Sequence, residues 1–303
     1  MTDYKLSAVL YKLKILWYNL CRILRRCPMA VEVPEKIKNE QLLSDYAQEE
    51  PLPQKLLPIG RNNRVGLLDL LRGLAIIFVM TYHLLYDLIF FGGVRIPFFF
   101  SDTMDIIHNF FLIILFSVSG ICAGFSKNVL RRGAVLFLLG ELLTLGTAAF
   151  APDNLIVFGV LSCFGSVMLI YGIISPVMKK LPRTALFVVF VLLSVIFWDF
   201  SHTSGLNLIF TTIPLDLPRD SLFLYPIGII SYDFHSADYF PLVPFGFVFL
   251  AGTALSDYFK SGKLPEVFYK AKLPVVNFLG KYSLWVYIIH QPVFMAAVYI
   301  IFR

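Results

Sequence analysis

The sequence predicts an all-α fold in which about seven helices cross a membrane as a polytopic bundle. Of its 303 residues, 58% are hydrophobic and only 15% are charged. Several apolar runs reach about 18 residues with almost no charge, the length that spans about 30 Å of hydrocarbon. The sequence lacks the alternation of lipid-facing and lumen-facing residues that marks a transmembrane barrel, so helices are the expected spanning structure.

The first 64 residues differ from the rest of the chain. The stretch YKLKILWYNLCRILRRC is basic and aromatic, and a polar stretch with several prolines follows it. Lys12 and Lys14 interrupt the first apolar run, and no small-residue cleavage site follows, which argues against a secretory signal peptide. We predict a cytoplasmic basic interfacial segment and linker over 1–64, followed by a transmembrane domain over 65–303.

Seven apolar segments are predicted to cross the membrane. They are 65–91, 105–126, 129–150, 154–176, 184–200, 237–258 and 276–301. Lys and Arg are frequent in the N-terminal segment and in every second link, namely 127–132, 179–183 and 260–272, and sparse in the links between. By the positive-inside rule, the N-terminus is predicted to be cytoplasmic and the C-terminus extracytoplasmic. The long link 201–236 is predicted to form either a re-entrant hairpin or an extracytoplasmic lid.

The charge and the cysteines exclude some other classes of protein. The net charge of +6 comes from short segments between apolar runs, which is typical of orientation signals and not of a nucleic-acid surface. The four cysteines form no CxxC pair, and the five histidines form no HxxxH or HExxH motif. We therefore expect no metal site, no disulfide framework and no nucleic-acid partner.

Four ionisable residues share one face of the first predicted span. At 100° per residue, His83 lies about 20° from Arg72 on the helical wheel, and Asp69 and Asp87 each lie about 60° from Arg72 on that same side. Such a stripe is costly against lipid, so it is expected to face the bundle interior or a wet cavity. Arg72 and His83 are separated by about 16 Å along the axis, with Arg72 nearer the cytoplasm.

Within this stripe, two pairs are spaced for mutual contact. Asp87 lies one turn after His83, where a carboxylate can orient an imidazole that acts as a general base. Asp69 lies three residues before Arg72, where it can hold the guanidinium. The alternative for both pairs is a packing role that fixes the helix register. His108 and His202 are expected to be hydrated interface residues, and Gly120 and Gly124 are expected to allow close helix packing.

The sequence resembles the heparan-alpha-glucosaminide N-acetyltransferase catalytic-domain family of small bacterial membrane proteins, which is related to the acyltransferase-3 superfamily. An Arg and a His separated by ten residues, with an Asp on either side, resemble the signature on the first core helix of the acyltransferase-3 enzymes, and the rest of the sequence is closer to the N-acetyltransferase family. The matching pieces are DLLRGLAIIFVMTYHLLYDL (69–88), LFSVSGICAGFS (115–126), LRRGAVLFLLGELLTL (130–145), SADYFPLVPFGFVFLAGTAL (236–255) and FLGKYSLWVYIIHQPVF (278–294). They occur in order across the predicted transmembrane domain.

This resemblance implies a membrane-bound acyltransferase that modifies glycans in the bacterial plasma membrane. No bound cofactor is implied. The acyl donor would be cytoplasmic acetyl-CoA, and the acceptor would be a hydroxyl or amine of an extracytoplasmic molecule such as a glycan. The other partner would be membrane lipid. The chain has fewer spans than the enzymes it resembles, so part of their scaffold would be either missing or supplied by another subunit, such as a second copy in a homo-oligomer.

The resemblance also implies roles for individual residues. His83 would be the catalytic histidine assisted by Asp87, and Arg72, held by Asp69, would position the donor or polarise its thioester. Arg131 and Arg132 would suit the CoA phosphates, with a role as positive-inside anchors as the alternative. The mechanism stays open between general-base attack in a ternary complex and an acyl-histidine intermediate.

The last two matching pieces place four residues where an acceptor could bind. These residues are Asp238, Tyr239, His290 and Gln291. The alternative for Asp238 is a helix N-cap, and the alternative for His290 is a hydrogen bond to backbone freed by Pro292. Two other functions stay open: a transporter or channel with a charged intramembrane path, and a non-catalytic membrane scaffold.

Overall fold

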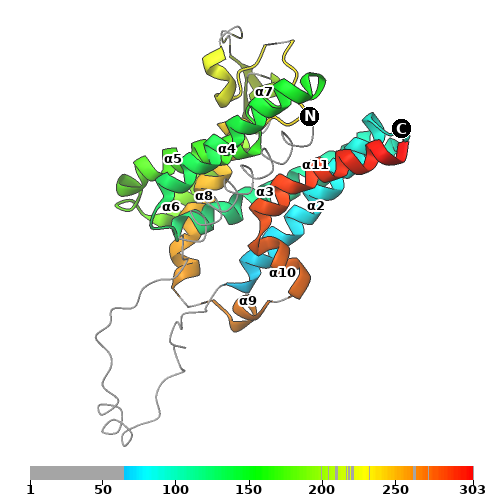
Figure 1. Cartoon of the computed structure of the whole chain (residues 1–303). Helices are drawn as coiled ribbons and strands as arrows, with labels where there is room; N and C mark the ends of the chain where they lie inside the picture. Colours follow the sequence, from blue (N-terminus) through cyan, green and yellow to red (C-terminus); the bar gives the residue numbers. More distant parts are fainter. Residues whose placement is uncertain are drawn as a thin grey trace, which may run out of the picture. The chain divides into compact units, whose positions relative to one another are not determined.

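The computed structural model describes residues 65–302, except for positions 199, 204, 209–210, 216, 218, 220–221, 232, 262–263 and 272. The predicted interfacial segment and linker, residues 1–64, lie outside this part of the chain. The described residues form a helical bundle with one small two-stranded sheet (Figure 1). The predicted all-α fold class is therefore confirmed.

Six helices in the described part of the chain are long and apolar enough to cross a membrane. They are α2 (Gly66–Phe90), α3 (Asp102–Gly124), α4 (Val129–Phe150), α5 (Val160–Met178), α8 (Leu242–Lys260) and α11 (Ser283–Phe302). The seventh predicted span corresponds to α6 (Arg183–Ile196), which is apolar but has only 14 residues. At 1.5 Å per residue α6 is about 21 Å long, shorter than the hydrocarbon core. These helices make the chain an integral membrane protein.

Three predicted span boundaries differ from the structure for local backbone reasons. The fourth span begins at Val160 and not at residue 154, because Phe158 has a φ of 52° and Gly159 is extended. The sixth begins at Leu242 and not at residue 237, since the residue before Pro241 is biased away from helix. The last span begins at Ser283, because Tyr282 leaves the helical region and separates α10 (Pro274–Lys281) from α11.

The remaining short elements lie in the links. They are η2 (Pro97–Phe100), η3 (Pro152–Asn154), α7 (Phe200–Thr203), β1 (Gly205–Leu208), β2 (Thr211–Pro214), η4 (Leu222–Ile227) and α9 (Glu266–Lys270). β1 and β2 pair antiparallel with Gly205 opposite Pro214. The link 201–236 therefore contains a β-hairpin, which the sequence analysis did not predict.

Glycines bring α3 and α8 into direct backbone contact. A Cβ on Gly120 would collide with the carbonyl of Phe249, and a Cβ on Gly252 would collide with the carbonyl of Ser117. Gly124 packs against the side chain of Ser256, which a Cβ on Gly124 would also meet. The spacing of Gly120 and Gly124 thus serves close helix packing, as the sequence predicts.

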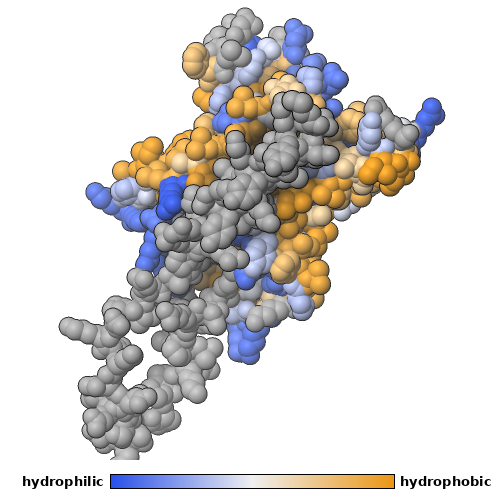
Figure 2. Space-filling model, viewed as in Figure 1, coloured by the Kyte–Doolittle hydropathy of each residue, from blue (hydrophilic) through white to orange (hydrophobic). Residues whose placement is uncertain are grey.

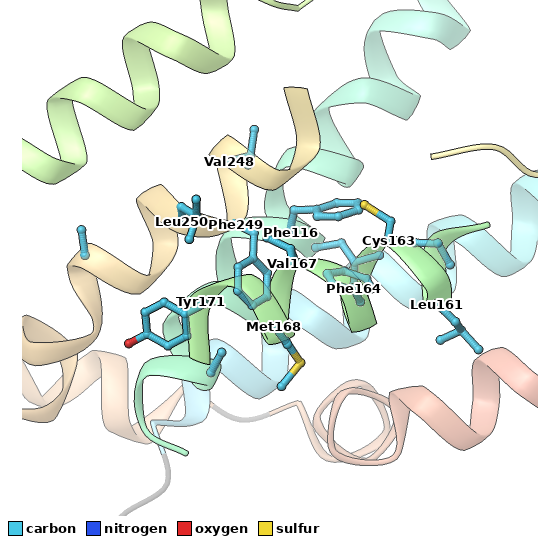
Figure 3. Close-up of a cluster of buried hydrophobic side chains, with 14 of the residues drawn as sticks. Phe116, Leu161, Cys163, Phe164, Val167, Met168, Tyr171, Val248, Phe249 and Leu250 are labelled. Atoms are coloured by element: carbon cyan, nitrogen blue, oxygen red, sulfur yellow. The ribbon is translucent and has the colours of Figure 1, made fainter. Parts of the chain in front are cut away.

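The main apolar core forms around this contact and includes α5. Phe116 is fully buried and stacks on Phe164 with ring centroids 4.3 Å apart. Val167 and Phe249 fill the same cluster (Figure 3). α6 packs on α8, and α5 packs on both α8 and α4.

α2 joins this core to the C-terminal helices. It packs on α3 on one side and on α10 and α11 on another (Figure 1). The start of α2 lies against α10, from which Asn277 donates to the carbonyl of Gly66 at 2.8 Å, whereas later residues of α2 meet α11. α2 and α11 therefore run in the same direction.

The outer surfaces of α4, α6 and α11 are apolar. Exposed side chains on α4 include Leu138, Leu142 and Leu145, and those on α11 include Ile300 and Ile301. Figure 2 shows apolar residues covering much of the visible helical surface, with hydrophilic residues mainly toward helix ends. Such surfaces are expected where helices face lipid.

We predict that Gly120→Ala destabilises the protein by about 1–3 kcal/mol, because the new Cβ forces apart two backbones that cannot yield locally. The measurement is the thermal unfolding midpoint of the purified protein in detergent. Gly146→Ala in α4 is the matched control, since a Cβ there meets no atom within 4 Å. Equal midpoints for the two variants would contradict the role given to the α3–α8 contact.

Candidate functional site

A cavity of about 150 Å³ lies among α2, α3, α5, α11 and the segment before α8. Its lining residues are Val79, Tyr82, His83, His108, Leu112, Leu115, Val160, Ala237, Asp238, Tyr239, Phe240 and Tyr287. The end of α2 and the starts of α3, α5 and α8 occur at one end of an up-and-down bundle, so the cavity lies toward that end. By the predicted orientation this end is extracytoplasmic.

His83 reaches the cavity from the second half of α2. Its neighbour Tyr82 stacks on His108 of α3, with ring centroids 4.4 Å apart and an angle of 18° between the planes. His108 therefore forms part of the cavity wall and is not a hydrated interface residue as predicted. The stack fixes one wall beside His83, where a substrate would meet aromatic faces.

Asp238 provides the carboxylate of the cavity. Its Oδ2 accepts a hydrogen bond from the Tyr287 hydroxyl at 2.9 Å and a longer one from the backbone N–H of Val160 at 3.5 Å. These bonds connect the segment before α8 to α11 and to the first residue of α5. The N-cap alternative for Asp238 at its own helix is not formed, because α8 begins at Leu242 after the extended N-cap residue Pro241.

Burial raises the pKa of Asp238 above its ordinary value. The hydrogen bonds from Tyr287 and Val160 and the nearby imidazoles of His108 and His290 act in the opposite direction, but they do not cancel the effect of burial. Asp238 consequently holds a proton more tightly in the folded protein than in an unfolded chain.

The Tyr239 ring lines the cavity, but its hydroxyl is engaged elsewhere. It donates to the carbonyl of Tyr225 at 2.6 Å, which ties the segment before α8 to η4. Burial raises the pKa of the Tyr239 hydroxyl. Tyr239 is therefore placed to supply an aromatic face, with its hydroxyl directed to the link.

His290 and Gln291 differ from their predicted position. Neither is among the residues that line the cavity, because His290 packs behind His83 and Gln291 faces α2. The ring centroids of His83 and His290 lie 5.1 Å apart. The predicted direct contact of these two residues with an acceptor is therefore not supported by their placement.

The predicted pairing of Asp87 with His83 is also not formed. Asp87 is fully buried, and its Oδ1 accepts a hydrogen bond from Gln291 Nε2 at 3.0 Å. Although one turn separates the two residues on α2, the His83 ring faces the cavity and His290, while Asp87 contacts α11. Asp87 thus fixes α11 against α2.

The predicted donor-binding residues lie toward the other end of the bundle. Asp69 and Arg72 are in the first two turns of α2, and Arg131 and Arg132 are in the first turn of α4. Arg72 is half-buried and forms no hydrogen bond or ion pair with any described residue. Arg131 is exposed. The structure therefore divides the predicted site residues into two groups, and α2 carries members of both.

Four aromatic residues of the cavity were not predicted as site residues from the sequence: Tyr82, His108, Phe240 and Tyr287. Tyr287 had a usable signal, because it shares a helical face with His290 and Gln291 at i, i+3 and i+4. His108 lies in the second turn of α3, at the same end of the bundle as His83. For Tyr82, the only indication of a role in the cavity was its position next to His83.

Two further observations limit the chemistry of the site. Within the described ranges, no group of three or more His, Cys, Asp or Glu side chains is arranged to hold a metal ion. Glu141, a carboxylate inside α4, accepts a hydrogen bond from the buried Ser162 hydroxyl at 3.0 Å. It thus pairs with α5 and lies outside the cavity lining.

These features define an integral membrane protein with a histidine and a carboxylate facing a common cavity near one end of its helical bundle. The model of the family described as heparan-alpha-glucosaminide N-acetyltransferase, catalytic, matches residues 64–292. The chain belongs to this family, which indicates a membrane acetyltransferase. No curated protein and no solved structure matches the chain.

We predict that the wild-type protein loses stability as pH rises, in part because Asp238 gives up its proton, and that Asp238→Asn makes this loss smaller. Because the folded pKa of Asp238 is raised, its contribution is most favourable below the unfolded pKa and is lost as pH rises through the folded pKa. Asn stays neutral and can still accept from Tyr287. The change in unfolding midpoint between about pH 4 and about pH 7 should therefore be smaller in the variant.

Asp153→Asn is the matched control for this prediction, because Asp153 is exposed in the link between α4 and α5. It should leave the pH dependence of the midpoint unchanged. If the unfolding midpoints of Asp238→Asn and wild type depend on pH in the same way, the pKa of Asp238 is not raised in the folded protein.

Proposed function

We propose that the protein transfers an acetyl group from cytoplasmic acetyl-CoA to a hydroxyl or amine of an extracytoplasmic acceptor, with a glycan as the expected acceptor. The observation that carries the proposal is the position of His83 in a cavity that also contains the Asp238 carboxylate. Family membership supports the acetyl transfer itself. The donor, the acceptor and the roles of the residues are the proposed part.

His83 is the proposed general base. Its imidazole takes the proton from the acceptor hydroxyl or amine as that group attacks the thioester carbonyl. The new bond joins the acceptor oxygen or nitrogen to the acetyl carbon, and the bond from that carbon to the CoA sulfur breaks. The proton finally passes to the thiolate, so the products are the acetylated acceptor and CoA thiol.

The composition of the cavity walls favours a sugar as acceptor. The rings of Tyr82, Tyr239 and Tyr287 offer flat aromatic surfaces against which the apolar faces of a sugar ring can pack. The Asp238 carboxylate, when ionised, supplies acceptor oxygens for sugar hydroxyls. A few placed polar groups in an otherwise apolar pocket are the usual basis of specificity in small-ligand sites.

The donor is proposed to approach from the opposite end of α2. Arg72 is half-buried and has no described partner, so its guanidinium can bind a phosphate or carbonyl oxygen. About 16 Å separates Arg72 from His83 along the helix axis. The long, thin pantetheine arm of CoA suits such a separation, because it carries the thioester away from the charged nucleotide. Arg131 and Arg132 would add charge at the same end.

We expect His83→Ala to lower acetyl transfer by about 10² or more, because proton transfer by a positioned base contributes on this order. The assay uses protein reconstituted in liposomes, labelled acetyl-CoA on one side, and a panel of sugars on the other. Expression and thermal midpoint should stay close to wild type. His235→Ala is the matched control, since His235 is exposed in the link before α8.

Full activity in a folded His83→Ala variant would contradict the proposed mechanism. The label also separates two routes of transfer. Label that is found only on the acceptor supports general-base attack, whereas label trapped on His83 of the protein would replace it with an acyl-histidine intermediate.

We expect Arg72→Lys to raise the KM for acetyl-CoA while the protein stays folded, because lysine keeps the charge but loses the bidentate fork of the guanidinium. The comparison is made at equal yield of monodisperse protein. Arg131→Lys, at an exposed position, should have a smaller effect. An unchanged KM and turnover in Arg72→Lys would reduce Arg72 to a structural role.

A further inference from the structure

α11 places an ionisable side chain at one of its two buried positions. Of the 20 residues in this helix, only His290 and Val298 are buried. His290 is 5% exposed and lies between Tyr287, Phe294 and His83, whose rings approach it at 5.3, 5.7 and 5.1 Å between centroids. Because burying an imidazole in a transmembrane helix is costly, this placement calls for a functional explanation.

One hydrogen bond fixes the tautomer of His290. Its Nδ1 lies 2.6 Å from the carbonyl oxygen of Tyr287. A carbonyl oxygen can only accept, so Nδ1 carries the proton and Nε2 of the neutral ring has a free lone pair. Nε2 is buried and has no hydrogen-bond partner among the described residues. The ring beside His83 therefore offers an unused proton acceptor.

We propose that His290 is a positioning residue that relays the proton of the reaction from His83. This inference rests on the proposed function, since it gives His83 the role of general base. In this proposal His290 supplies a second imidazole at the contact between α2 and α11. This imidazole lies outside the cavity lining and does not touch the acceptor.

The relay neither gains nor loses a proton over one transfer. One ring nitrogen of His83 takes the acceptor proton, and the N–H on its other nitrogen passes to His290 Nε2. This transfer needs a hydrogen bond between the two rings that is not formed in the structure without substrate and that forms when the acceptor binds. His290 is then an imidazolium that still donates from Nδ1 to the Tyr287 carbonyl. When the thioester breaks, the proton returns through His83 to the CoA thiolate, and both rings are neutral again.

The surroundings of His290 suit a transient extra proton. Asp87 Oδ2 and Gln291 Oε1 are also buried without a described hydrogen-bond partner, so the contact between α2 and α11 is rich in acceptors and poor in donors. Tyr287 couples this contact to the cavity, because its carbonyl faces His290 and its hydroxyl donates to Asp238.

The ionisable groups that face His290 come from several elements. They are His83 on α2, Asp238 before α8, and Tyr287 on α11 itself. Since several of these groups titrate, a pH profile alone would not isolate His290. The test therefore counts protons in the transfer step.

The experiment measures single-turnover acetyl transfer by the reconstituted full chain in mixtures of H₂O and D₂O. In wild type, the relay predicts a curved dependence of rate on deuterium fraction, because two protons move in one step. His290→Asn keeps an amide N–H near the Nδ1 position for the Tyr287 carbonyl but removes the proton acceptor. It should lower the rate about tenfold or more, leave the KM for the acceptor unchanged, and make the dependence linear.

His235→Asn, the same change at an exposed position, should match wild type. If His290→Asn does not fold, His290→Gln serves in its place, because it also lacks a titrating ring. A linear dependence in wild type, or a folded His290 variant with wild-type rate and curvature, would overturn the relay.

These failures are distinct from a failure of the proposed function. If His83→Ala is inactive while His290→Asn behaves as wild type, only the relay is wrong. If wild type transfers no acetyl group, or if His83→Ala is fully active, the proposed function is wrong.

Discussion

The bilayer interior has no water to satisfy polar groups, so every ionisable side chain in a span needs a partner or a cavity inside the bundle. In α2 this constraint decides where the neighbouring helices lie. Asp87 is fully buried and finds its partner in Gln291 of α11, while His83 finds a cavity bordered by α3, α5 and the segment before α8. α2 thus connects the apolar core to the C-terminal helices.

The two halves of the bundle are held by different contacts. α3 and α8 meet at Gly120 and Gly252, where backbone touches backbone and no polar side chain is required. α2 and α11 meet through the hydrogen bond between Asp87 and Gln291 and through the imidazoles of His83 and His290, whose planes are tilted by 54°. Glycine contacts tolerate almost no change in volume, whereas the polar contact leaves three buried acceptor atoms without described partners. The chemistry is therefore expected where the packing is polar and less complete.

The sequence was sufficient for features that depend on composition and helical spacing. It predicted the helical class, the approximate spans, the glycine contact, and the division of α2 into an Arg72 end and a His83 end. It also placed His83 together with Asp238 and Tyr239 through the family resemblance, and the structure brings these three to one cavity. Local backbone geometry at Phe158, Pro241 and Tyr282 was not visible in hydropathy, so three span boundaries were wrong.

Side-chain partners across helices were harder to predict, because helical spacing describes neighbours within one helix only. The i, i+4 spacing predicted a bond between His83 and Asp87, but Gln291 competes for the same carboxylate from α11 and forms the hydrogen bond. The displaced pairing has a chemical consequence. If His83 were bonded to Asp87, its second partner would be a carboxylate. In the structure its neighbour is instead the imidazole of His290, whose tautomer is set by the Tyr287 carbonyl. A neutral ring in that place can take up a proton and return it, which suits a step in which the base must be restored after each transfer.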